Sequence, residues 1–269
     1  NGTTGESPTL SKQEKEQMLR FALDIVDGRV PVLAGTGSNN TQESIEMTLL
    51  AEEIGVDGVM LVSPYYNKPN HHGVIAHFKA IASATTLPIL LYNIPGRSMI
   101  NMPVEVVVEL SHVDNIFGIK EASGDLNQMA SILAKAAPGF QVYSGDDGLT
   151  LPLLAIGGSG VISVASHVLG SEMQEMITTF QQGKVQRAAQ MHRTLLPAFQ
   201  LLFSEPNPIA LKYELNRRGY EVGSVRLPLV PMTVDTESVN TFKQGWSQFE
   251  RQRSHLFTNQ TSTLKVASY

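Results

Sequence analysis

The sequence predicts an α/β fold in which parallel strands alternate with helices. From residue 30 onward, short apolar segments rich in β-branched residues lead into loops of Gly, Pro, Asn or Asp, and an amphipathic helical segment follows. The apolar segments are continuous, with no polar residue at every second position, as expected for parallel strands covered on both faces. The predicted strands span residues 30–35, 58–63, 88–93, 116–121, 140–145 and 160–165.

The spacing of these strands favours βαβ units. Successive strands begin 20 to 30 residues apart, which leaves room for a helical crossover between parallel neighbours. Either an open doubly wound sheet or a closed (β/α)8 TIM barrel would fit this spacing. The segment 2–8 has the character of a loop between a strand and a helix. The barrel interpretation therefore expects a strand-helix-strand unit ahead of Asn1.

Two helices in the first half carry clear start signals. The segment 11–27 opens with Ser11 and Glu14 at the spacing of a capping box. The segment 41–54 opens at Thr41 and has an acidic first turn, which the helix dipole favours. On the first of these helices, the apolar positions that we expect to be buried are Met18, Phe21, Ala22 and Ile25.

Strand signals end near residue 183. The helices predicted beyond that point span residues 184–203, 206–219 and 236–252. The predicted parts of the chain are a barrel over 1–183, a C-terminal helical domain over 184–253 and a polar tail over 254–269.

The composition excludes several classes of function. The 269 residues carry a net charge of −5 with no basic block, so no nucleic-acid surface is predicted. The absence of cysteine excludes disulfides and thiolate chemistry and fits a reducing compartment, so we expect a cytoplasmic protein. No apolar run approaches the roughly 18–20 residues of a membrane helix. The histidines and glycines lack the spacing of zinc-protease and nucleotide motifs, so neither a metal nor a nucleotide cofactor is expected.

Lys120 is the main candidate for chemistry. Among ten lysines, it alone lies inside a strongly apolar strand segment. Burying an ammonium group is costly, and the same loss of water lowers its pKa and supplies a free amine that can attack a carbonyl. The alternative is a structural ion pair, for example with the adjacent Glu121.

Further candidates lie where strands end and loops begin. Tyr92 ends its strand, so in a barrel its hydroxyl would face the same mouth as Lys120 and could transfer protons; the alternative is an aromatic residue on the rim. Arg97 could bind a carboxylate through two hydrogen bonds or form a surface salt bridge. Thr3 and Thr4 lie between glycines, where they could bind an anion or simply form a turn.

Taken together, the motifs resemble those of a known superfamily. In chain order they are Gly2–Ser7, Tyr65–Pro69, Tyr92–Arg97, Gly118–Ser123, Ser144–Asp147, Gly160–Ala165 and Arg226–Val230. They resemble the pyruvate-dependent Schiff-base aldolases and N-acetylneuraminate lyases and, within them, the dihydrodipicolinate synthase family. The resemblance covers about residues 1–232. It implies a (β/α)8 barrel followed by a C-terminal helical domain.

The resemblance also implies a reaction through a covalent imine. Lys120 would form a Schiff base with pyruvate, with no other cofactor, and the derived enamine would attack aspartate semialdehyde. The product would be the heterocycle used in lysine and diaminopimelate synthesis. Thr4, Tyr92 and Tyr66 would form a proton relay. Because the family takes the tyrosine at position 66 from a neighbouring subunit, a homo-oligomer, either a dimer or a tetramer, is expected.

The same resemblance assigns binding roles. Thr3 and Thr4 would hold the pyruvate carboxylate, Arg97 would hold the carboxylate of the semialdehyde, and Gly145 and Ile162 would line the pocket. The Thr-Thr pair differs from the Ser-Thr of sialic acid lyases. The alternatives are a sugar-acid aldolase with the same Gly-Thr-Thr-Gly motif, a catalytically silent homologue, and a metal-dependent aldolase.

Some relatives are inhibited by lysine at a second site. The positions that match this possible allosteric site are Ser7, Asn39, Glu43 and Tyr65. Lys12 and Lys15, however, stand where the inhibited relatives carry histidines. Because cationic side chains repel lysine, we expect weak inhibition or none.

Overall fold

The computed structural model describes residues 1–257 and divides into two compact units. The first unit contains Asn1–Val164 together with Val225–Pro228, and the second contains Ala165–Ser224 and the chain from Leu229 onward. The division falls at Ala165, whereas the sequence places the end of the barrel domain at residue 183. The predicted tail over 254–269 lies outside the described residues from position 258 onward. Its first part is packed, because Leu256 and Phe257 are buried.

The first unit is built on a parallel sheet, which confirms the α/β class. Its strands are β1 (Leu33–Gly35), β2 (Gly58–Val62), β3 (Ile89–Asn93), β4 (Ile116–Glu121), β5 (Gln141–Ser144) and β6 (Gly160–Val161). Each strand pairs in parallel with the one that follows it in the chain, so the order across the sheet is β1-β2-β3-β4-β5-β6. A doubly wound sheet instead reverses its strand order at a switch point. The sequential order therefore disfavours that alternative.

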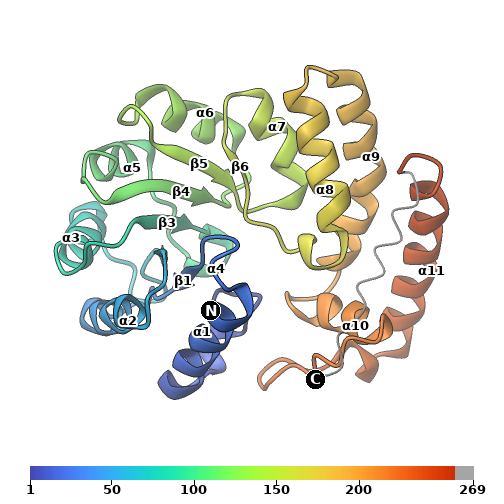
Figure 1. Ribbon diagram of the computed structural model, residues 1–269, viewed down its shortest axis with the longest axis horizontal. Helices are drawn as coiled ribbons and strands as arrows, with labels where there is room; N and C mark the ends of the chain where they lie inside the picture. Colours follow the sequence, from blue (N-terminus) through green and yellow to red (C-terminus); the bar gives the residue numbers. More distant parts are fainter. Residues whose placement is uncertain (258–269) are drawn as a thin grey trace. The chain divides into compact units, whose positions relative to one another are not determined.

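Helices cover the outer face of this sheet. The helices of the first unit are α1 (Lys12–Val26), α2 (Thr41–Ile54), α3 (His71–Ala82), α4 (Pro95–Ser98), α5 (Val104–Leu110), α6 (Leu126–Lys135) and α7 (Thr150–Ala155), with 3-10 turns at Ser7–Thr9 and Asp147–Leu149; the short α4 lies near the ends of the strands (Figure 1). Successive long helices pack against one another around the sheet (Figure 1). The predicted capping box of α1 is confirmed, since Ser11 and Glu14 exchange both hydrogen bonds. At α2 the capping side chain is that of Asn40, which accepts hydrogen bonds from two N–H groups of the first turn.

The core lies between the outer face of the strands and the helices. Fully buried residues from the strands include Leu61, Leu91 and Ile119, and they belong to the same apolar cluster as Phe78 and Ile81 of α3. Complete burial of such a side chain contributes about 1.5–3 kcal/mol. The continuous apolar character of the strands is thus explained by burial that leaves no regular polar face.

The prediction for the buried face of α1 is wrong. Met18, Phe21 and Ile25 are 42%, 67% and 59% exposed, and Ala22 is only partly buried. The helix instead packs through Leu19, which belongs to the core cluster, and through the partly buried Leu23, which packs against that cluster four residues further along the same side. A helix that packs through this narrow stripe leaves the neighbouring apolar positions outside the contact.

The second unit is helical. Its helices are α8 (Ser166–Gln181), α9 (Val185–Leu202), α10 (Ile209–Arg217) and α11 (Thr236–Arg253), with a 3-10 turn at Met232–Val234. The rings of Phe242 and Trp246 stack with centroids 5.4 Å apart in its core. The fully buried Glu214 forms ion pairs with Arg217 and Arg218 at 2.7 Å. The helices predicted after residue 183 are therefore present, with ends that differ by a few residues.

Two isoleucines on helices of the first unit offer a matched test of this packing. Ile81→Ala should lower the free energy of unfolding by about 2–5 kcal/mol, because Ile81 is completely buried and its truncation leaves a cavity. Ile25→Ala should change it by less than about 0.5 kcal/mol, since most of that side chain already lies in water. Denaturant titration measures both values. Equal losses in the two variants would contradict the packing of α1.

Candidate functional site

Adjacent strands place Lys120 and Tyr92 side by side. The register of the sheet pairs Tyr92 of β3 with Lys120 of β4, near the carboxyl ends of both strands. The Nζ atom of Lys120 lies 4.2 Å from the centroid of the Tyr92 ring. The lysine amine and the tyrosine are therefore neighbours, at the end of a parallel sheet where active sites of α/β proteins are found.

The environment of Lys120 favours a neutral amine. Burial lowers the pKa of its side chain to about 8, and the negative charge of Asp147 partly opposes this fall. At pH 7 roughly a tenth of such amines are unprotonated, compared with fewer than about one in a thousand for a lysine with the ordinary pKa. Asp147 is 1% exposed and follows β5, the strand next to β4. The geometry thus supplies a nucleophilic amine near physiological pH.

Tyr92 is held in its protonated form. Burial raises the pKa of its phenol, while a hydrogen bond with the Thr3 side chain and the charge of Arg97 oppose this rise. The family resemblance places Thr4 in the relay with this hydroxyl and gives Thr3 a carboxylate-binding role. The structure adds Thr3 to the groups that contact Tyr92, and the relay role of Thr4 stays a prediction. A protonated phenol next to an amine can act as a general acid.

A cavity of about 270 Å³ brings several of the expected residues together. Thr3, Tyr92 and Arg97 line it, and Ser7, Glu43 and Tyr65 of the possible allosteric set line it as well. Lys15 also borders this cavity. Part of the substrate-binding set and part of the regulatory set therefore share one hollow of the first unit. The residues that line it do not include Lys120, Thr4, Gly145, Ile162 or Asn39.

Glycine at position 145 leaves room for the lysine. A Cβ atom on Gly145 would lie 3.1 Å from Cε of Lys120 and 2.6 Å from Cβ of Ala122. The second distance is far below a normal contact, so a larger residue there would displace the backbone or the lysine. Ile162, the other predicted lining residue, follows β6 and donates its N–H to Ser144 O at 2.9 Å. It therefore lies beside the end of β5, the strand that precedes Gly145.

Tyr66 does not reach Tyr92 within the described chain. Its side chain is 86% exposed, whereas Tyr92 is 5% exposed. The backbone of Tyr66 has a φ of 72°, in the left-handed region that is costly for a bulky side chain. The surrounding loop is tied to the possible allosteric set, because Asn67 Nδ2 donates to Asn39 O at 2.9 Å. The loop thus holds an aromatic residue outward in a strained conformation.

The ion pair considered for Lys120 and Glu121 is not formed. Consecutive residues of a strand point to opposite faces, and the Glu121 carboxylate instead accepts hydrogen bonds from Asn93, Ser123 and Gln128. Sequence reasoning also missed Asp147. Its position directly after a strand that neighbours the lysine strand was the available signal.

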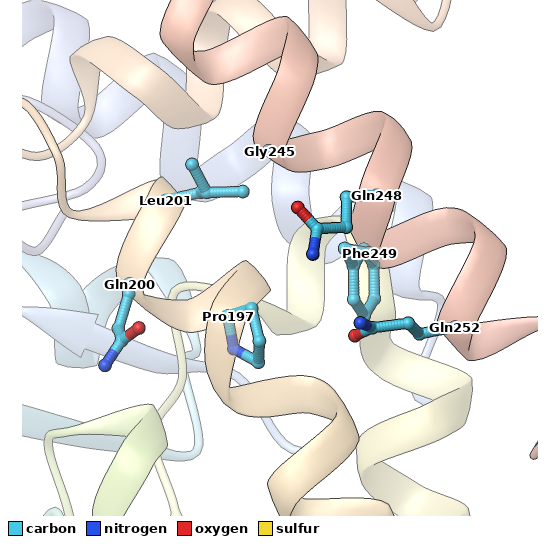
Figure 2. Close-up of a pocket in the computed structure, with 7 residues that line it drawn as sticks. All are labelled: Pro197, Gln200, Leu201, Gly245, Gln248, Phe249 and Gln252. Atoms are coloured by element: carbon cyan, nitrogen blue, oxygen red, sulfur yellow. The ribbon is translucent and has the colours of Figure 1, made fainter.

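Another hollow, in the second unit, lacks comparable chemistry. It measures about 340 Å³ and lies between α9 and α11 (Figure 2). The residues drawn around it are Pro197, Gln200, Leu201, Gly245, Gln248, Phe249 and Gln252. None of these side chains titrates or acts as a nucleophile near neutral pH. The lysine and tyrosine of the first unit therefore remain the better candidate for an active site.

Residues 1–257 contain neither a cluster of metal-binding side chains nor a membrane-spanning helix. Within residues 1–257, no three or more His, Asp or Glu side chains gather in a way that could hold a metal ion. Across the same residues, no helix has both the length and the apolar character needed to cross a membrane.

Comparison with known proteins identifies the family. The sequence pattern of the dihydrodipicolinate synthetase family matches residues 1–244. The chain belongs to this family. Among the family's members, a protein of Halalkalibacterium halodurans named 4-hydroxy-tetrahydrodipicolinate synthase 1 is 56% identical over 236 residues, which are 88% of this chain and 80% of the relative. The synthase of Bacillus subtilis is 54% identical over 235 residues, covering 87% of this chain and 81% of the relative.

Solved structures of the family superpose well on this chain. The crystal structure of a dihydrodipicolinate synthase from Bacillus anthracis gives a TM-score of 0.88 at 52% identity, covering 91% of this chain and 84% of that one. The 4-hydroxy-tetrahydrodipicolinate synthase of Methylacidiphilum fumariolicum gives 0.92 at 42% identity, covering 95% and 85%. The dihydrodipicolinate synthetase family therefore accounts for both the sequence motifs and the sheet described above.

The lowered pKa of Lys120 has a direct consequence for reactivity. The rate at which pyruvate and borohydride label this lysine should rise with pH through a midpoint near 8, since only the free amine attacks the carbonyl. Mass spectrometry of the labelled peptide at several pH values measures the profile, with Lys120→Ala as the unlabelled control. A midpoint above about 10, typical of a solvated lysine, would contradict the dry environment.

Proposed function

We propose that this protein is a 4-hydroxy-tetrahydrodipicolinate synthase, a lyase that condenses pyruvate with L-aspartate 4-semialdehyde in lysine and diaminopimelate biosynthesis. The observation that carries the proposal is the half-buried side chain of Lys120, whose Nζ lies 4.2 Å from the Tyr92 ring centroid and whose pKa is lowered by burial. Membership of the family and the names of relatives that share more than half of the aligned residues support the same activity.

The first stage is formation of an imine. The neutral amine of Lys120 attacks the keto carbon of pyruvate and gives a carbinolamine. Tyr92, whose phenol stays protonated because burial raises its pKa, donates a proton to the departing hydroxyl, which leaves as water. Thr3, which hydrogen bonds to Tyr92, and Thr4 complete the proton path and bind the pyruvate carboxylate.

The second stage forms the carbon–carbon bond. Loss of a proton from the pyruvate methyl group gives an enamine, whose carbon attacks the aldehyde carbon of the semialdehyde while Arg97 holds its carboxylate. The aldehyde oxygen takes up a proton from the Tyr92 relay and becomes the hydroxyl group of the product. The amino group of the condensed chain then attacks the imine carbon and expels the Lys120 amine, which closes the ring. Gly145 and Ile162 shape the pocket, and no cofactor beyond the covalent pyruvate is required.

The proposal includes a second copy of the chain. The exposed and strained Tyr66 is suited to enter the site of a neighbouring subunit, where it would join Tyr92 in the relay. We therefore propose a homodimer or a dimer of dimers in the cytoplasm.

The proposal also includes the complete fold of the family. The sequential order of the parallel strands β1 to β6 supports their assignment as six of the eight strands of a (β/α)8 barrel, which is followed by a C-terminal helical domain.

Borohydride trapping tests the chemistry of the proposal. Pyruvate with reductant should add one reduced pyruvate to Lys120, and Lys120→Ala should abolish both the label and turnover. Lys135→Ala, which removes another lysine from a helix of the same unit, serves as the matched control and should leave both intact. A label on a different lysine would refute the assignment.

A substrate comparison tests the acceptor. Aspartate semialdehyde should be consumed with pyruvate at least about a hundredfold more efficiently than sugar aldehydes, and Arg97→Ala should raise its KM by roughly tenfold or more, because a charge-assisted pair is lost. Preference for a sugar aldehyde would favour a sugar-acid aldolase. Loss of activity with a chelator would favour a metal-dependent one.

The cavity residues also predict the response to lysine. Lys15 borders the cavity that contains Ser7, Glu43 and Tyr65, so it adds a positive charge where a second cation would have to bind. Free lysine should therefore inhibit only above millimolar concentration, and Lys15→Gln should strengthen inhibition. Steady-state kinetics with added lysine measures both effects, and an inhibition constant well below millimolar for the unaltered protein would contradict this prediction.

A further inference from the structure

A buried carboxylate lies directly beside the reactive lysine in the chain. Glu121 follows Lys120 on β4 and is 0% exposed. Burial raises the pKa of its carboxyl group, while hydrogen bonds from Asn93, Ser123 and Gln128 oppose that rise. A carboxylate in a dry site is costly unless its oxygens are satisfied. Its retention at this position therefore calls for an explanation that the reaction itself does not supply.

Neutral donors surround the Glu121 carboxylate. Asn93 Nδ2 lies 3.1 Å from Oε1 and 3.0 Å from Oε2, and Gln128 Nε2 lies 3.1 Å from Oε2. The Ser123 N–H donates to Oε1 at 2.7 Å. These contacts join β3, β4, the loop after β4 and α6 through one side chain. A buried network in which every group has a partner restricts its members to one arrangement.

Asn93 extends this network to the segment that carries Arg97. Asn93 Oδ1 accepts a hydrogen bond from Met102 N at 3.0 Å, and its Nδ2 also contacts Asn101 Oδ1 at 2.7 Å. The side chain at the end of β3 thus contacts the far end of the 94–102 segment, in which Arg97 belongs to α4. These hydrogen bonds join the residue just before the segment to the last two residues of the segment, and we call this junction its base.

Gln128 of α6 completes the base of that segment. Its amide exchanges two hydrogen bonds with Asn101, at 2.8 and 3.1 Å, and donates to Met102 O at 3.2 Å. The same amide donates to Glu121. The network is therefore bordered by Tyr92 before Asn93, by Lys120 before Glu121, and by the Arg97 segment.

We propose that Glu121 and Asn93 are positioning residues that hold Lys120, Tyr92 and the Arg97 segment in their reactive arrangement. Neither touches the reacting atoms; each acts through the residue next to it in the chain or through the closed segment. The inference rests on the roles proposed above for those three residues. A small displacement of reacting groups reduces rates steeply, by about a hundredfold for an error near 1 Å.

Glu121→Gln is the sharpest single test because it keeps the size of the side chain. The new amide presents hydrogens to the Nδ2 group of Asn93, which also donates, so the pair loses its complementarity. Labelling with pyruvate and borohydride in a separate sample counts the competent active sites. The kcat expressed per competent site should fall by about tenfold to a hundredfold. The KM for aspartate semialdehyde should rise several-fold, because the segment that carries Arg97 loosens.

An exchange of the two groups provides the rescue. Adding Asn93→Asp to Glu121→Gln restores one donor facing one acceptor between positions 93 and 121, since the amide and the acid have changed places, and the new carboxylate can still accept from Met102 N. The exposed Asn101 amide must turn over in this variant, so that its Nδ2 group, and not its Oδ1 atom, faces the new carboxylate. The double variant should recover at least half of the logarithmic loss in kcat. If the logarithmic loss in kcat of the double variant equals the sum of the losses of Glu121→Gln and Asn93→Asp alone, the two residues do not share a role and the inference is contradicted.

A matched control lies at the other end of the same strand. Asn115, directly before β4, uses its Nδ2 to bind Ala82 O and Thr85 O at 3.0 Å, far along the strand from Lys120. Asn115→Ala should lower Tm but leave KM and the rate per labelled site unchanged. A purely structural role for Glu121 would give that same result, with reduced Tm and constants within twofold of the unaltered protein, and would overturn the inference.

A milder variant decides the matter if Glu121→Gln does not fold. Asn101 is exposed, so Asn101→Ala should fold while removing one partner of Asn93 and of Gln128. It should raise the KM for the semialdehyde about threefold or more and leave the labelling rate of Lys120 unchanged; an unchanged KM would refute the inference. Failure of the unaltered protein to label at Lys120 would instead reject the proposed function itself.

Discussion

The cost of keeping an ammonium group out of water shapes the site more than any other interaction. Lys120 lies on a strand whose other residues are mostly apolar, and burial therefore favours its neutral form. Asp147 restores part of the lost stabilisation, so the amine still exchanges protons near neutral pH. Burial shifts the pKa of Tyr92 in the opposite direction, upward, so the phenol keeps its proton. One physical condition thus favours the neutral forms of the amine and the phenol that we propose as nucleophile and acid on neighbouring strands.

The alternation of side chains along β4 divides two tasks between consecutive residues. Lys120 faces its partner Tyr92, while Glu121 lies among the amides on the other side of the strand. In a loop the side chains of Lys120 and Glu121 could form an ion pair, but on a strand they point to opposite faces. The parallel register then carries this separation to β3, where Tyr92 and Asn93 repeat it. In each strand the residue proposed for the reaction, Tyr92 or Lys120, is therefore followed directly by the residue proposed to position it.

The sequence predicted most of the fold because its signals are local. Continuous apolar runs located all six strands, and capping residues located the starts of helices. The buried face of α1 was predicted wrongly because the helix has more apolar residues than its contact with the core can bury. The sequence alone does not show that Leu19 is buried while Phe21 and Ile25 stay exposed. The partners of Glu121 and the contact of Thr3 with Tyr92 were missed for another reason: they join residues distant in the chain, and no periodicity encodes them.

The segment from Ile94 to Met102 has a property that matters for how such enzymes diversify. Its base is closed by Asn93 and Gln128, and Ser98 ties its interior together through the carbonyls of Ile94 and Ile100. Substitutions that spare Ser98, Asn101 and Met102 would leave both its closed base and its internal hydrogen bonds in place. If Arg97 binds the aldehyde as proposed, changes at the other positions of this segment could therefore alter which aldehyde is accepted, while the proposed nucleophile Lys120 on β4 stays unchanged.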